Sequence, residues 1–85
     1  MPHPMTDDIR AILREHGRLA VDVDRLADES NLYEGGLTSH ASVNLMLALE
    51  VAFDVEFPDS MLKRSVFQSV ASISAALRQL GTYAA

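Results

Sequence analysis

The sequence predicts an all-α domain of three principal helices and one short helix, with a long first loop. Two observations support this prediction. Apolar residues recur at helical spacing in three segments that Gly or Pro residues separate. No segment alternates apolar and polar residues over the length of a strand. The 85 residues fit a single domain, 1–85, because domains usually run to about 100–150 residues. We expect residues 1–5 to be flexible.

The first helix is expected to begin after Thr6 and to end at Gly17. The Thr6 hydroxyl is suited to cap a helix N-terminus, and glycine commonly ends a helix. Four residues between them share one helical face: Ile9, Ile12, Leu13 and His16. This narrow stripe needs a partner element to cover it.

The segment from Arg18 to Thr38 is predicted to be a loop. Its apolar residues are scattered among acidic ones, and Gly35-Gly36 marks its end. Because about twenty residues is long for a connection in so small a domain, we expect its apolar residues to pack across the helices. The segment could contain a turn of 3₁₀ helix.

The helix from Ser39 to Phe53 is the most strongly predicted element, since it contains no Gly or Pro and is rich in Leu, Met and Ala. Pro58 is expected to terminate it, because the residue before a proline resists helical geometry. Asp59 would then cap a short helix that runs to about Lys63.

The last helix is expected from about Ser69. Its apolar residues recur at helical spacing: Val70, Ile73, Leu77 and Leu80. Gly81 is expected to stop it.

The middle helix has two apolar faces. One carries the expected core residues Ala41, Leu45, Leu49, Ala52 and Phe53, with Met46 at its border. The opposite face carries Val43, Leu47 and Val51. A surface helix normally keeps that side polar. Either a residue of the first loop, such as Val21 or Leu26, covers this second face, or the face docks a partner. Exposure of Val43 and Leu47 would favour docking.

Ser39 opens the middle helix directly after Gly35-Gly36-Leu37-Thr38. Free backbone N–H groups and the helix dipole make such a position favourable for a phosphate. A serine before a helix is, however, more often a simple N-cap. Thr38 can supply the cap and leave Ser39 free. Position alone therefore leaves both interpretations open.

Composition excludes several function classes. Seven basic against twelve acidic residues give a net charge of −5, and Lys63 is the one lysine. Such a chain is unsuited to nucleic acid or to an anionic membrane. It has no cysteine for thiolate chemistry. The N-terminus resembles no signal peptide, and no apolar stretch is long enough to span a bilayer, so a cytoplasmic protein is expected.

Two catalytic or metal-binding arrangements are also set aside. A calcium loop that begins at Asp22 would need Gly and Glu where Ala27 and Tyr33 stand. A hydrolase triad built on Ser39 would need His40 to take the serine proton, but adjacent helical residues point about 100° apart. We therefore expect neither a metal site nor catalysis by this chain.

Residues 36–50 resemble the acyl carrier protein family. The matching stretch is Gly-Leu-Thr-Ser-His-Ala-Ser-Val, followed by the helix Asn-Leu-Met-Leu-Ala-Leu-Glu and then by Phe53 and Pro58. The resemblance implies that family's four-helix bundle. It also implies that a phosphopantetheinyl transferase attaches 4′-phosphopantetheine from coenzyme A to Ser39. The terminal thiol of that group would hold a substrate as a thioester.

Residues 32–43 are most similar to stand-alone aminoacyl carrier proteins. Thr38 and His40 replace the Asp and Leu that flank the serine in most acyl carriers, and Asn44 and Val51 replace usual acidic residues. The resemblance implies a partner ligase related to seryl-tRNA synthetases, which uses ATP to load glycine or alanine. It implies that the partner-binding residues are Thr38, His40, Val43, Asn44, Leu47, Glu50 and Val51.

Two alternatives stay open at this point. One is an acyl carrier for a lipid or polyketide pathway, which should shelter a long chain between its helices. The other is an unmodified helical adaptor that docks through Val43, Leu47 and Val51. An aminoacyl thioester carries an ammonium group that is costly to bury. We therefore expect a tightly packed bundle with the amino acid left outside. We also expect a monomer.

Overall fold

The computed structural model describes residues 5–81, and within this range it contains helices and no strand. The elements are α1 (Met5–His16), the 3₁₀ turn η1 (Val23–Arg25), α2 (Ser39–Phe53), the 3₁₀ turn η2 (Asp59–Met61) and α3 (Val70–Gln79). The predicted all-α fold is confirmed, with the short fourth helix reduced to a single 3₁₀ turn. The expected flexibility of residues 1–4 lies outside the described residues.

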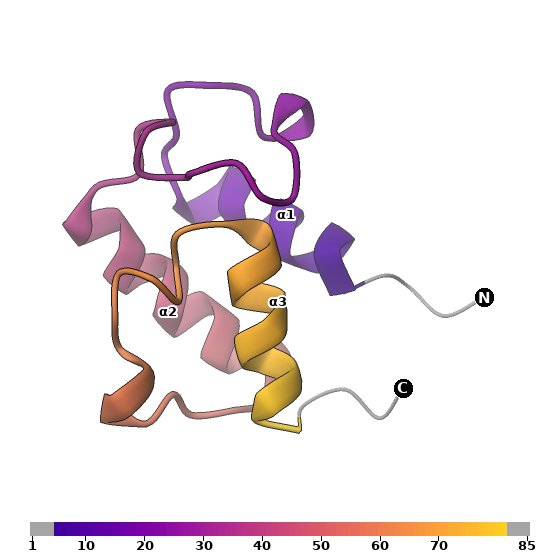
Figure 1. The fold of residues 1–85 in the computed structure, drawn as a ribbon, viewed down its shortest axis with the longest axis vertical. Helices are drawn as coiled ribbons and strands as arrows, with labels where there is room; N and C mark the ends of the chain where they lie inside the picture. The colour runs from indigo at the N-terminus through magenta and orange to yellow at the C-terminus, as the bar shows by residue number, and fades with distance from the viewer. Residues whose placement is uncertain (1–4, 82–85) are drawn as a thin grey trace.

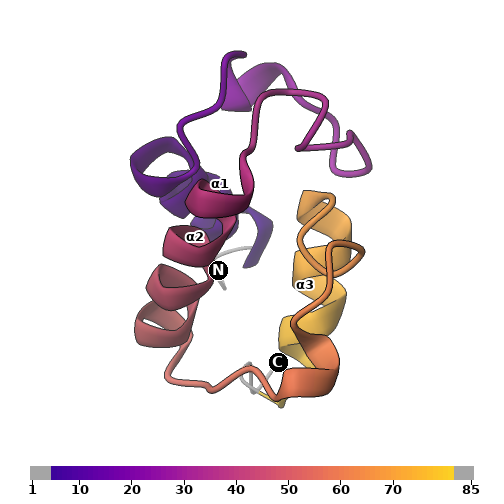
Figure 2. The ribbon, with the colours of Figure 1, turned by 90° about the vertical axis from the view of Figure 1, so that its left-hand side faces the viewer.

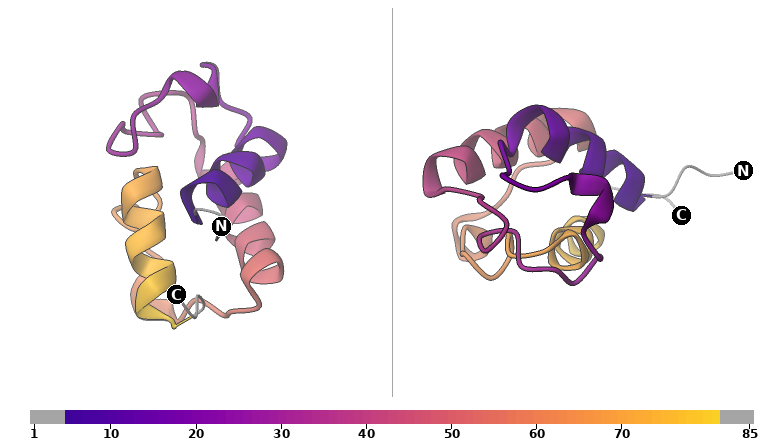
Figure 3. Two further views of the ribbon diagram at one scale, coloured as in Figure 1. Left: turned by 90° about the vertical axis from the view of Figure 1, so that its right-hand side faces the viewer. Right: turned by 90° about the horizontal axis from the view of Figure 1, so that it is seen from above.

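The three helices surround one apolar core. α1 packs against both α2 and α3, which lie on two sides of the molecule and run in the same direction (Figures 1 and 2). The first loop crosses the end of the bundle at which α2 and α3 begin, as Figure 3 shows from two further sides. Eight large side chains in the centre are less than 2% exposed: Ile9, Leu13, Leu32, Leu45, Leu49, Val70, Ile73 and Leu77. These side chains form the core that the helices and the first loop share.

The start of α1 differs from the prediction. The helix begins at Met5, so Thr6 lies inside it and is not its N-cap. Met5 stands one turn before Ile9 and is buried on the same face, and its Sδ accepts a hydrogen bond from Ser74 Oγ at 3.3 Å. Packing against α3 therefore orders Met5, which was expected to be flexible, and lengthens the helix.

The end of α1 falls at His16, just before Gly17 as predicted. The residue with left-handed backbone geometry is Arg18, however, at φ 50°. His16 was placed on the inner face but is exposed, because the core beside α1 ends at Leu13.

Side chains of α1 hold the first loop in place. Arg10 donates one hydrogen bond to the Val23 carbonyl oxygen and another to Asp28 Oδ1, both at 2.7 Å. Arg14 pairs with Asp24. Three apolar residues of the loop are buried: Val23, Leu32 and Leu37. The loop is therefore packed across the helices and contains a 3₁₀ turn, as the sequence indicates.

α2 has the predicted bounds, but its end has a different cause. Asp54 adopts left-handed geometry at φ 54°, and the Val55 N–H donates to the Glu50 carbonyl oxygen at 3.1 Å. The helix thus stops before Pro58 can influence it. Of the expected core residues, Ala41, Leu45 and Leu49 are buried, Met46 and Phe53 are half-buried, and Ala52 is exposed. Ala52 is exposed because it lines an open surface groove with residues of α1.

Both bounds of the short helix predicted after α2 need correction. η2 begins at Asp59, so Pro58 precedes the turn and Asp59 does not cap it. The turn also ends before Lys63. α3 begins after Ser69 as predicted, and Ser69 and Ser72 exchange side-chain to backbone hydrogen bonds at 3.0 Å. Gly81 follows α3 with a positive φ of 74°.

Candidate functional site

Ser39 stands at the first turn of α2 with its side chain exposed. The preceding Thr38 is the N-cap, since its Oγ1 accepts a hydrogen bond from the Ala41 N–H at 3.0 Å. The Ser39 hydroxyl has no hydrogen bond to any of residues 5–81. The capping role predicted for Thr38 is thus confirmed, and it leaves the neighbouring hydroxyl available for reaction.

A compact turn over residues 31–37 positions the start of α2. Asn31 Oδ1 accepts hydrogen bonds from the N–H groups of Tyr33 and Glu34, at 2.9 and 3.2 Å. Gly36 has a positive φ of 113°, and a Cβ there would lie 2.7 Å from the Ala20 nitrogen. Only glycine fits this position. The close contact between Gly36 and Ala20 therefore fixes the path of the chain that leads into Ser39.

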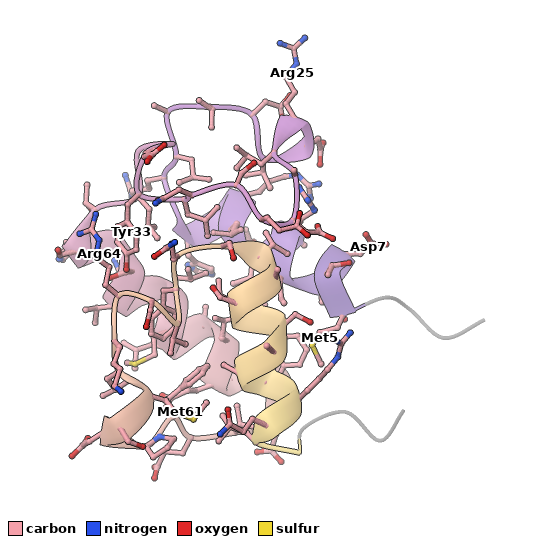
Figure 4. All side chains as sticks on the ribbon, viewed as in Figure 1. Met5, Asp7, Arg25, Tyr33, Met61 and Arg64 are labelled. Carbon is pink, nitrogen blue, oxygen red and sulfur yellow. The ribbon has the colours of Figure 1, made fainter. Side chains whose placement is uncertain are left out.

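A surface groove of about 300 Å³ begins at Ser39. It lies between the first half of α2 and the segment that follows η2. Its lining residues are Tyr33, Ser39, Ser42, Val43, Met46, Leu62, Lys63, Arg64 and Phe67. Figure 4 shows Tyr33 and Arg64 side by side near the start of α2.

The outer face of α2 is uncovered in the monomer. Val43 is 52% exposed, Leu47 50% and Val51 84%. Val21, a candidate cover, is itself exposed. The exposure therefore favours the docking interpretation over a structural one.

The predicted partner-binding residues divide between two grooves. Val43 lines the groove beside Ser39, whereas Asn44, Leu47 and Val51 line a second groove between α1 and α2. Thr38 and His40 are exposed at the helix start. Glu50 is half-buried, and its Oε2 accepts a hydrogen bond from the Phe57 N–H at 2.8 Å. Glu50 thus has a structural contact in addition to the docking role predicted for it.

Sequence reasoning missed several residues of these grooves. The α1 side of the second groove is formed by Ile12, Glu15, His16 and Arg18. Lys63 and Arg64 line the first groove from a segment far from Ser39 in sequence, and only the folded chain brings them beside α2. Tyr33 also lines this groove, from the stretch 32–43 that the family resemblance covers, but no role was predicted for it.

The described residues bring together neither a metal site nor a membrane helix. Among residues 5–81, no three His, Asp or Glu side chains gather closely enough to hold a metal ion. None of the helices in that range has the length and apolar character needed to cross a membrane. The chemical feature that remains is the Ser39 hydroxyl, which is exposed at the N-terminus of α2 next to an open groove.

The chain matches the model of the phosphopantetheine attachment site family over residues 7–77. Because this match covers most of the chain, the protein belongs to that family of carrier proteins. The family is defined by its phosphopantetheine attachment site, and its matched relatives are carrier proteins.

The individual relatives are more specific. The aminoacyl carrier protein of Agrobacterium fabrum is 52% identical over 69 residues, which cover 81% of this chain and 83% of the relative. Solved structures agree with this likeness. In a complex of an engineered Bradyrhizobium japonicum glycine:carrier protein ligase with ATP, the carrier protein from Agrobacterium tumefaciens superimposes with a TM-score of 0.87 at 47% identity. The match covers 89% of this chain and 99% of that one.

A second complex contains the Bradyrhizobium japonicum ligase with a glycylated carrier protein. Its matching chain has a TM-score of 0.64 and 35% identity, and the match covers 85% of this chain and 92% of that one. The chain is therefore a homologue of aminoacyl carrier proteins that work with amino acid:carrier protein ligases.

Proposed function

We propose that this protein carries an activated small amino acid, glycine or alanine, on a 4′-phosphopantetheine group attached to Ser39. The observation that supports the attachment point is the exposed Ser39 hydroxyl beside the Thr38 cap. The site suits a phosphodiester, because the first N–H groups of α2 have no intrahelical acceptor and the helix dipole favours an anion there. The open groove leaves room for the arm.

Modification replaces the Ser39 O–H bond with an O–P bond. The Ser39 oxygen attacks the pantetheine-side phosphorus of the coenzyme A pyrophosphate, the hydroxyl proton is lost, the P–O–P bond breaks, and adenosine 3′,5′-bisphosphate leaves. Because His40 points away from Ser39, the base that accepts this proton belongs to the phosphopantetheinyl transferase. When bound, the arm supplies the thiol that a chain without cysteine lacks and holds the amino acid on it as a thioester.

Aminoacyl cargo is favoured over a long acyl chain. The centre of the bundle is filled by side chains, whereas a long acyl chain would need space there. The similarity to carrier proteins solved with glycine:carrier protein ligases also supports this choice. The partner is an ATP-dependent ligase, whose own pocket selects glycine or alanine.

The ligase docks on the exposed side of α2. The interface comprises Thr38, His40, Val43, Asn44, Leu47, Glu50 and Val51. Apolar residues gathered on a monomer surface are typical of such an interface. The protein acts as a monomer in the cytoplasm, where coenzyme A and ATP supply its two partner enzymes.

The decisive experiment is the intact mass of the protein after incubation with coenzyme A and a broad-specificity phosphopantetheinyl transferase. One added phosphopantetheine is expected on the natural chain and on Ser42→Ala, and none on Ser39→Ala. Ser42 is a suitable control, because it lies one turn further along α2 and its Oγ donates to the Ser39 carbonyl oxygen at 2.7 Å.

Loading is then tested with ATP, the partner ligase and either glycine or alanine. A mass increase of one aminoacyl group that hydroxylamine removes would identify the thioester. A chain that accepts no phosphopantetheine contradicts the proposal and leaves the unmodified adaptor as the function. Equal addition to Ser39→Ala contradicts Ser39 as the attachment point.

A further inference from the structure

The groove beside Ser39 has a positively charged rim. Lys63 and Arg64 both line it and are exposed. No carboxylate among residues 5–81 lies within ion-pair distance of either cation. By contrast, Arg10 and Arg14 are paired with Asp28 and Asp24. In a chain with a net charge of −5, these two adjacent cations form a positively charged patch beside Ser39.

Arg64 is held in a defined position. Its guanidinium carbon lies 3.9 Å from the centre of the Tyr33 ring, at a distance typical of cation–π contacts. Tyr33 belongs to the turn that the Asn31 side chain fixes. Stacking against the ring leaves the edge of the guanidinium available for an anion. Figure 4 shows this pair at the end of the molecule where α2 begins.

The remainder of the groove is largely apolar. Val43 and Met46 line it from α2, and Leu62 and Phe67 from the opposite segment. Leu62 is 45% exposed. Phe67 is buried and fixed by an edge-to-face contact with Phe57, with ring centres 5.4 Å apart. A rigid apolar surface thus lies next to the charged rim.

We infer that this groove binds the first part of the phosphopantetheine arm, an inference that rests on the function proposed above. Lys63 and Arg64 bind the phosphodiester, whose negative charge is attached directly to the Ser39 oxygen. The next part of the arm is a carbon that bears two methyl groups, and these pack on Met46, Leu62 and Phe67. The groove therefore presents both the positive charge and the apolar surface that this part of the arm can bind.

The charge of the rim also affects the cargo. Because Lys63 and Arg64 repel a cation, the ammonium group of a bound amino acid is kept out of the groove. The phosphate end is therefore docked while the thioester end extends into solvent. Both cations are exposed, so salt screens the interaction and the arm exchanges between docked and extended positions.

The inference is tested by NMR on the holo protein, after intact mass has established that one arm is attached. Nuclear Overhauser effects are expected between the paired methyl groups of the arm and both the Met46 methyl group and the Phe67 ring. They should be several-fold weaker in the double variant Lys63→Gln/Arg64→Gln. Arg25→Gln is the matched control, since it removes an exposed charge from η1, far from the groove (Figure 4).

A second measurement uses the natural holo chain alone, so that it does not depend on the folding of any variant. The same effects should weaken as sodium chloride is raised. Their absence from the natural holo chain, or their persistence at full strength in the double variant, would overturn the inference and leave the proposed function intact. A chain that accepts no arm on Ser39 fails the mass measurement first, and the inference then fails together with the proposed function.

Discussion

The two faces of α2 are both apolar, yet they have opposite environments. Leu45 and Leu49 on the inner face are fully buried, whereas Leu47 and Val51 on the outer face are 50% and 84% exposed. The difference comes from what covers each face, since the core contacts only one of them. The exposed apolar residues of the outer face lie outside the core, as is typical of residues that bind a partner protein. The comparison therefore separates the residues that hold the fold from those that serve a partner.

The largest effect should come from truncating the inner face. Leu45→Ala is expected to lower the free energy of unfolding by about 2–5 kcal/mol, because it removes buried apolar contacts and leaves a cavity. Leu47→Ala, only two residues away, should change it by less than about 0.5–1 kcal/mol. Urea denaturation followed by circular dichroism measures both. Equal losses would show that the outer face also belongs to the core.

A smaller effect is expected at the start of α2. Thr38→Ala should cost about 1 kcal/mol, since it removes the hydrogen bond from the Ala41 N–H to the cap. Ser39→Ala should cost less than about 0.5 kcal/mol, because its hydroxyl stabilises nothing in the fold. The same urea titrations compare the two variants. A larger loss for Ser39→Ala would identify Ser39 as the structural residue of the pair.

The smallest effect on stability is expected from charge on the outer face. The free energy of unfolding of Leu47→Asp should lie within about 0.5 kcal/mol of that of the natural chain. The same variant should strongly reduce kcat/KM for aminoacylation by the ligase, because it places a charge in an apolar contact. Val21→Asp is the control, since Val21 is 45% exposed on the first loop and lines a separate groove. Equal loss of ligase activity in both variants would contradict a docking site on α2.

Local signals in the sequence predicted the bounds of α2, its Thr38 cap and the start of α3 at Ser69. These features depend on neighbouring residues, so a single sequence contains enough information to find them. The first residue of α1 was missed because Met5 is ordered by contact with Ser74 on α3, and no local pattern reports such a contact. The end of α2 was assigned to Pro58 because left-handed geometry at Asp54 has no strong sequence signal.

The candidate site was predictable only in part. Ser39 and the outer face of α2 follow from motif and periodicity within one continuous segment. The charged rim at Lys63 and Arg64 does not, because its position beside Ser39 depends on how the chain returns after η2. The same holds for His16 and Arg18, which α1 places beside Leu47.

Three backbone hydrogen bonds hold the first loop in shape, and they have a consequence for how this sequence can diverge. Ala20 donates to the Gly35 carbonyl oxygen at 2.9 Å, Leu32 to that of Gln68 at 2.7 Å, and Ala71 to that of Asp28 at 2.8 Å. None of these bonds uses a side chain. They therefore exclude proline at the three donor positions, because proline has no N–H to donate. The bonds themselves place no other restriction on the side chains at these positions. Over evolutionary time these three bonds can survive side-chain changes at the donor positions, whereas Gly36 and Asn31 stay constrained by the loop contacts that position Ser39.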